Sequence, residues 1–138
     1  MQVLLDTCAI IFRAQGLAMS KTSKAAIDRA AKADGVLISP VSAWEIGLLT
    51  RPERLGRLEL GMEPPAWFAR VMREPGAAEA QFTHEIAMAS TRLPGDFHRD
   101  PADRFLVATA RALNVPIVTR DEDMEAYAKA GHVKLIRC

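Results

Sequence analysis

The sequence predicts an α/β fold in which a central, mostly parallel sheet of four or five strands is flanked by helices in three layers. Short apolar runs alternate along the chain with helical stretches. Three of these runs are apolar at every position, as is typical of parallel strands that are buried on both faces. Aromatic residues make up only 6% of the chain and alanine is abundant. This composition favours helices packed on a small sheet over an all-β sandwich.

Four short apolar runs are the predicted strands, and each is too short to form a helix. They span Val3–Leu5, Val36–Ile38, Val115–Val118 and Val133–Ile136, the last of them as an edge strand. Helices are expected over Ser23–Ala33, Val41–Leu49 and Pro101–Leu113. The first ends at an Asp-Gly pair, and the other two follow the helix-starting pairs Ser-Pro and Asp-Pro.

The segment Arg51–Gly76 is predicted to be a loop followed by a short helix. One face of this helix is apolar and carries Trp67, Phe68, Val71 and Met72. We expect this face to pack in the core or against another subunit, and a groove for a partner is the alternative.

Length and charge limit the class of protein. A chain of 138 residues supports one hydrophobic core, so we expect a single domain over residues 1–138. Its net charge of +1 excludes a polybasic chain that wraps nucleic acid and an acidic disordered tail. No apolar stretch reaches the roughly 18 residues of a membrane span, and the first residues do not show the basic region followed by an apolar region that is typical of a signal peptide. We therefore expect a cytoplasmic protein that does not act on a membrane.

Acidic residues occur where the predicted strands end. Right-handed crossovers make consecutive strands parallel, so their carboxyl ends meet at one edge of the sheet, where open α/β domains keep their sites. Four acids are expected at this edge: Asp6, Glu45, Asp103 and Asp121. Each also has a local explanation as a helix cap or as a charge near a positive helix end. Together they would repel one another unless a cation neutralised them, and their hard oxygen ligands suit Mg²⁺ or Mn²⁺.

Other phosphate-handling sites fit the sequence less well. The stretch Asp6-Thr7-Cys8 lacks the second aspartate that a haloacid-dehalogenase-like phosphatase needs. None of the eight glycines forms a dinucleotide-binding or P-loop pattern. His98 could form a zinc-like set of ligands with Asp100 and Asp103. The alternative is a histidine that simply lies in a loop or that supports a metal ligand without binding the ion.

The segments around the four acids resemble the PIN domains, in particular the VapC toxins of type II toxin–antitoxin systems. The resemblance lies in Leu4–Thr7 (LLDT), Ser39–Gly47 (SPVSAWEIG), His98–Ala110 (HRDPADRFLVATA) and Val118–Asp121 (VTRD). It covers nearly the whole chain, with the four segments in the same order and at similar spacing. It implies a PIN-like fold and an endoribonuclease that uses Mg²⁺, with Mn²⁺ as a possible substitute. It also implies a small antitoxin protein as partner and a homodimer.

Motif by motif, the resemblance makes Asp6, Glu45, Asp103 and Asp121 the catalytic acids. We expect Asp6 and Asp103 to hold the metal and the other two acids to orient a water or hold a second ion. Asp100 competes with Asp103 as a ligand, and Asp123 could assist or replace Asp121. Direct attack by water predicts a 5′-phosphate product. The alternative is a catalytically silent PIN-like module that binds RNA or protein.

Basic residues gather between positions 11 and 32, where they are candidates for contacts with an RNA backbone or simply a solvated helix face. They are Arg13, Lys21, Lys24, Arg29 and Lys32; Arg99, Arg104 and Arg120 lie nearer the acids. Single-stranded or looped RNA is the expected substrate, because its scissile phosphate must enter a cleft. Trp44 is expected in the core, with base stacking as the alternative. The hydroxyls of Thr7, Ser42 and Thr119 flank the acids and could bond them or cap helices.

Overall fold

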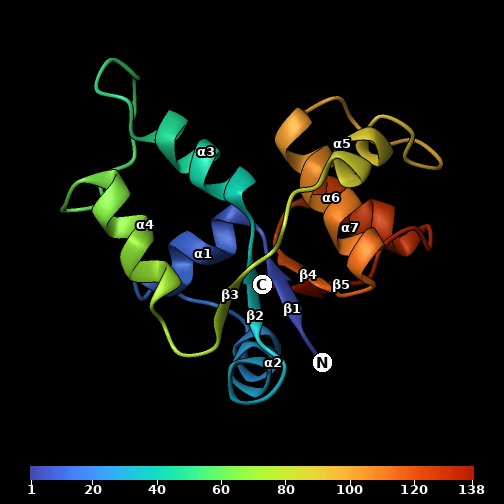
Figure 1. Ribbon diagram of the computed structural model, residues 1–138, viewed down its shortest axis with the longest axis horizontal. Helices are drawn as coiled ribbons and strands as arrows, with labels where there is room; N and C mark the ends of the chain where they lie inside the picture. The colour runs from blue at the N-terminus through green and yellow to red at the C-terminus, as the bar shows by residue number, and fades with distance from the viewer.

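Five parallel strands form the central sheet of the computed structural model, which describes residues 1–138 (Figure 1). The strands are β1 (Val3–Leu5), β2 (Val36–Ile38), β3 (Ala77–Glu79), β4 (Ile117–Thr119) and β5 (Leu135–Arg137). They lie in the order β3-β2-β1-β4-β5, and every neighbouring pair is parallel. The predicted α/β fold is confirmed, with five strands and no antiparallel pair.

Seven helices surround this sheet. They are α1 (Thr7–Ala14), α2 (Lys21–Lys32), α3 (Pro40–Leu49), α4 (Pro64–Met72), α5 (His84–Ser90), α6 (Pro101–Leu113) and α7 (Glu122–Lys129). The three helices predicted from their terminal signals are α2, α3 and α6, and the short helix predicted after the loop is α4. No helix is long and apolar enough to cross a bilayer.

The two faces of the sheet are buried by different helices, because alternate residues of a strand point to opposite faces. Val3 and Leu5 of β1 belong to one core cluster with residues of α1, α2 and α4. Leu4 belongs to the second cluster, with residues of α6 and α7. The strands β1, β2 and β4 are buried at every residue. Helices, sheet and helices are therefore the three layers that we expected.

The apolar face of α4 packs in the first of these clusters. Trp67 and Val71 are buried there, and Phe68 and Met72 pack against it partly buried. This confirms the expectation that the face is a packing surface.

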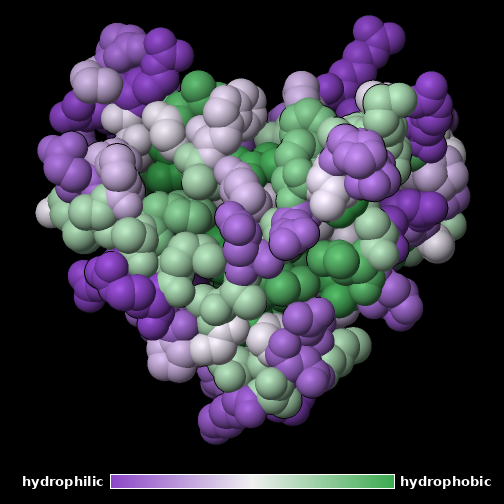
Figure 2. All heavy atoms as spheres, in the orientation of Figure 1, coloured by the Kyte–Doolittle hydropathy of each residue, from purple (hydrophilic) through white to green (hydrophobic).

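Four helices begin at the carboxyl edge of the sheet. Helices α1, α3 and α7 directly follow β1, β2 and β4, and α6 runs back toward the start of β4. Ser39 caps α3 and Asp100 caps α6, and in both helices a proline follows in the first turn. Because helix N-termini carry partial positive charge, this edge favours negative side chains. Figure 1 shows α3 and α4 on one side of the edge and α5, α6 and α7 on the other, and Figure 2 shows a notch between the two lobes.

Strand β3 and helices α1, α5 and α7 were not predicted. The residues of β3 are Ala77, Ala78 and Glu79, all at least partly exposed, so no apolar run marks this edge strand. The chain enters β3 through Gly76 at φ 81°, where a Cβ atom would lie 2.5 Å from the backbone of Ala31. Only glycine allows this close approach between the sheet edge and α2.

Candidate metal centre

Asp6, at the end of β1, is the most enclosed of the predicted acids, with 6% of its surface exposed. Its Oδ1 accepts a hydrogen bond from the backbone N–H of Thr7 at 2.7 Å, so Asp6 also caps α1. Its Oδ2 accepts from the hydroxyl of Thr119 at 2.5 Å and from the thiol of Cys8 at 3.4 Å. Burial raises the pKa of Asp6 above its ordinary value, although these donors act in the opposite direction.

Glu45 lies on α3, across from the start of α1. The hydroxyl of Thr7 donates to its Oε1 at 2.6 Å and also lies 2.9 Å from the hydroxyl of Ser42. Burial raises the pKa of Glu45, and the negative charges of Asp6 and Asp100 raise it further. The structure therefore connects the ends of β1 and β2 through one buried hydroxyl, and two of the flanking hydroxyls do bond the acids.

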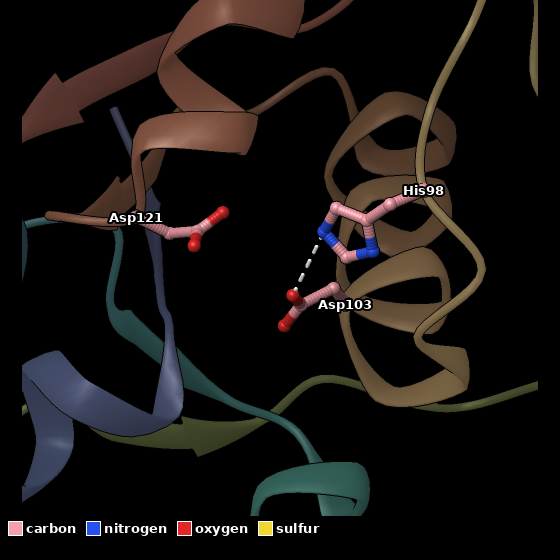
Figure 3. Close-up of side chains that lie close together, drawn as sticks. All are labelled: His98, Asp103 and Asp121. Carbon is pink, nitrogen blue, oxygen red and sulfur yellow. Dashed lines mark ion pairs between the residues drawn. The ribbon is translucent and has the colours of Figure 1, made fainter.

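Asp103, Asp121 and His98 form the tightest group of possible metal ligands (Figure 3). One ligand atom from each lies within 4.8 Å of the other two. Asp103 comes from the first turn of α6, Asp121 from the turn between β4 and α7, and His98 from the loop before α6. The Oδ2 atom of Asp121 accepts from the backbone N–H of Met124 at 2.9 Å, so Asp121 also caps α7.

Asp103 lies in the negative field of all the other acids. Burial and the charges of Asp6, Asp100, Asp121 and Glu45 raise the pKa of Asp103 to about 8. No backbone N–H or hydroxyl donates to its carboxylate, and its close polar contact is the Nε2 atom of His98, 3.1 Å from Oδ2. The four predicted acids are thus brought to one edge of the sheet, where their charges act on one another.

The two competing acids lie further out. Asp100 is exposed and uses Oδ1 to cap α6 through the backbone N–H of Ala102, at 3.1 Å. Asp123 has 71% of its side chain exposed, and its Oδ2 lies 3.8 Å from Nε2 of His98. Neither belongs to the tight group. The zinc-like set with Asp100 does not form, because Asp100 meets the imidazole with its backbone N–H.

The free oxygens at this edge fit a hard divalent cation. Glu45 and Asp121 each keep one carboxylate oxygen that accepts no hydrogen bond, and Oδ1 of Asp103 has no polar contact within the protein. A Mg²⁺ or Mn²⁺ ion takes ligands of this kind and would relieve the repulsion that raises the pKa of Asp103. These residues therefore fit the Mg²⁺ or Mn²⁺ ion that the resemblance implies.

Two of the arginines near the acids already contact groups of the protein itself. Arg104 donates to the carbonyl oxygens of Ser90, Phe97 and His98. Arg120 stacks on Phe12, with its guanidinium carbon 3.9 Å from the ring centroid, and donates to the carbonyl oxygen of Ala18. Arg99 is exposed and makes no such contact. Of the three, Arg99 is therefore the one available to a ligand at this edge.

Two other expectations about RNA contacts change with the structure. Trp44 has 54% of its surface exposed, so the prediction that it packs in the core is wrong. Helix α2, which carries Lys21, Lys24, Arg29 and Lys32, lies at the opposite end of the molecule from the opening between α3 and α5 (Figure 1). This position favours the interpretation of the α2 cations as a solvated helix face.

A family model described as PIN domain matches residues 3–130 of the chain. The chain belongs to the PIN domain family. The match confirms the resemblance seen in the four acidic segments. This PIN domain is also 27% identical to Ribonuclease VapC22 of Mycobacterium tuberculosis H37Rv. The alignment spans 126 residues, or 91% of each chain.

Solved structures share the fold over nearly their whole length. One is VapBC2 from Rickettsia felis bound to a DNA fragment from its promoter, with a TM-score of 0.70, 12% identity and coverage of 99% and 98% of the two chains. FitAB bound to an IR36 DNA fragment matches with a TM-score of 0.61, 18% identity and coverage of 98% and 94%. VapBC-5 from Mycobacterium tuberculosis has a TM-score of 0.58, 17% identity and coverage of 99% and 98%. At these identities the likeness concerns the fold.

Proposed function

We propose that this PIN domain is a Mg²⁺-dependent endoribonuclease that acts in the cytoplasm as the toxin of a toxin–antitoxin pair, with Mn²⁺ as a possible substitute. The observation that carries the proposal is the gathering of Asp6, Glu45, Asp103 and Asp121 at one edge of the sheet. Similarity to a protein named as a ribonuclease, across 91% of both chains, supports RNA as the substrate.

Asp6 and Asp103 are the proposed metal ligands, and the proximity of Asp121 to Asp103 makes Asp121 a third. When bound by these residues, a divalent ion would supply Lewis-acid chemistry, by which a water would become more acidic and the scissile phosphate more electrophilic. Glu45 is the proposed base for that water, because its raised pKa lies nearer neutrality and Thr7 holds one of its oxygens. Attack by water leaves a 5′-phosphate and a 3′-hydroxyl.

Single-stranded or looped RNA is the proposed substrate class, because the acids come from four separate segments at one edge of the sheet and the scissile phosphate must pass between these segments to reach them. Trp44 is exposed and directly precedes Glu45 on α3, so its indole is a candidate platform for a base. Arg99 directly precedes the helix cap Asp100 and is exposed, so it is a candidate for a phosphate contact.

A small antitoxin protein is the proposed partner, in keeping with the VapBC complexes that share the fold. A groove of about 490 Å³ lies between α1, α4 and the loop before α4. Its lining includes apolar Leu60, Met62 and Trp67 and the charged residues Arg13, Arg70 and Glu74. We place the antitoxin contact there, because a groove with both apolar and charged lining suits an amphipathic segment. Met62→Glu should then prevent the antitoxin from co-purifying with the toxin.

A homodimer is the proposed oligomeric state. It is tested by the mass of the protein in solution, which should be roughly twice 15.1 kDa.

The decisive experiment compares three reactions on the same RNA: wild type with Mg²⁺, wild type with EDTA, and Asp6→Ala with Mg²⁺. We expect cleavage in the first alone, and fragments that a 5′-phosphate-dependent exonuclease degrades. Equal cleavage in all three would reveal a contaminating nuclease and contradict the proposal. RNA binding without cleavage under any metal would instead support the silent binding module.

A further inference from the structure

His98 stands beside the proposed metal centre on a loop that the protein holds firmly. Its ring stacks on Phe97, with centroids 4.3 Å apart, and Phe97 in turn packs on Tyr127. Arg104 donates to the carbonyl oxygens of Phe97 at 3.0 Å and of His98 at 3.1 Å. The imidazole is therefore held in position before any ligand arrives, and a role for it at the centre needs no movement of the loop.

The two nitrogens of this ring have different partners, and the partners define its tautomer. Nδ1 of His98 accepts a hydrogen bond from the backbone N–H of Asp100 at 3.1 Å. Because a backbone N–H can only donate, Nδ1 carries a lone pair and the proton of the neutral ring is on Nε2. A protonated Nε2 has no lone pair to offer a metal ion. It can donate, and Oδ2 of Asp103 lies 3.1 Å away.

We propose that His98 is a positioning residue, which donates from Nε2 to Asp103 outside the coordination sphere of the metal and does not bind the ion itself. The inference rests on the proposed metal centre and adds to it the residue that orients one of its ligands. Asp103 needs such support, because its carboxylate accepts no other contact of this kind from the protein. With Oδ2 engaged by the imidazole, Oδ1 would be the oxygen left to hold an ion. Loss of a hydrogen-bond donor that orients a metal ligand commonly weakens metal binding roughly 10- to 100-fold.

Two substitutions distinguish the roles of the two ring nitrogens of His98. Glutamine places its amide NH₂ near the position of Nε2, so His98→Gln keeps the donor to Asp103. Asparagine places its amide oxygen near Nδ1, so His98→Asn keeps the acceptor for the backbone of Asp100 and loses the donor. Mn²⁺ affinity of the full chain is measured from the electron paramagnetic resonance signal of the free ion. We expect His98→Gln to stay close to wild type and His98→Asn to bind Mn²⁺ about tenfold more weakly or worse.

Two further measurements distinguish a positioning role from a structural or ligating one. Wild type loaded with Mn²⁺ should show no modulation from a directly bound nitrogen-14 in electron spin echo spectra. In an Asp103→Ala background, His98→Asn should cause no additional loss of Mn²⁺ affinity, because the carboxylate that it served is absent. His84→Asn is the matched control, since His84 has 87% of its side chain exposed on α5.

Nitrogen modulation in wild type, together with equal losses in the Gln and Asn variants, would make His98 a direct ligand and overturn the inference. So would wild-type affinity in His98→Asn. Both results would leave the proposed ribonuclease intact. Absence of Mn²⁺ binding and of RNA cleavage in wild type would instead remove the proposed function as well. The spin echo measurement on wild type needs no variant, so the inference stays testable if His98→Asn does not fold.

Discussion

Asp121 and Asp103 face each other across the proposed metal centre, yet the protein holds them by different means. Asp121 caps α7, so the local backbone of its own helix orients the carboxylate. Asp103 caps nothing, and its close polar contact is His98, on the preceding loop. Asp121 thus has two roles, since it stabilises the fold as a helix cap and also contributes to the proposed site. Asp103 serves the site alone, and its raised pKa shows that it destabilises the metal-free fold.

The largest effect is expected for Asp103→Ala. RNA cleavage should fall at least about a hundredfold, because a proposed ligand is lost. The melting temperature of the metal-free protein should stay the same or rise, because the cost of burying this carboxyl group among other acids is removed. Asp28→Ala, at an exposed position of α2, is the control and should change neither quantity. A marked fall in the metal-free melting temperature of Asp103→Ala would contradict the contrast between the two acids.

The pH dependence of stability is the next expected effect. The ordinary pKa of an aspartate is 3.8, whereas that of Asp103 in the folded protein is about 8. Between these values the unfolded chain has lost a proton that the folded protein keeps, so metal-free stability should fall as pH rises through this window. After allowance for solvent screening, the fall should be about 2 kcal/mol. Urea unfolding measured across the window checks it.

Asp103→Asn is the matched variant for this titration, and it should flatten much of the pH dependence. The raised pKa values of Asp6 and Glu45 act in the same direction, so part of the fall should remain. Stability that rises with pH over the same window would show that the acids do not repel one another in the folded protein.

A smaller effect is expected at the capping acid. Asp121→Ala should lower the free energy of unfolding of the metal-free protein by about 1 kcal/mol, because the N–H of Met124 loses its partner. Asp121→Asn keeps the cap and removes the charge, so it should stay close to wild type in stability while weakening Mg²⁺ binding. Equal stability of the Ala and Asn variants, measured by chemical unfolding, would remove the capping role.

The smallest effect is expected at the hydroxyl that supports Glu45. Thr7→Val removes the hydrogen bond to Oε1 and should lower the cleavage rate about threefold, because Glu45 is then less well oriented. Thr7→Ser keeps a hydroxyl and should restore most of the rate. Identical rates in the two variants would show that Thr7 acts by packing alone.

Much of the site was predictable because its acids follow local signals. The apolar runs at Val3–Leu5 and Val36–Ile38 are strands in the structure with the predicted bounds, and the Asp-Pro pair before Asp103 begins α6. Strand β4 begins and ends slightly later than its predicted run. Since parallel strands bring their carboxyl ends together, the order of these signals along the chain was enough to predict one shared edge.

The sequence by itself determined four of the five strands, the main helix starts and the set of acids, because each depends on neighbours within a few residues. Only the tertiary structure decided the exposed strand β3, the exposure of Trp44 and the engagement of Arg104 with the loop before α6. It also decided which nitrogen of His98 meets Asp103. These features depend on contacts between segments whose approach no local pattern specifies, so they follow from packing and not from periodicity.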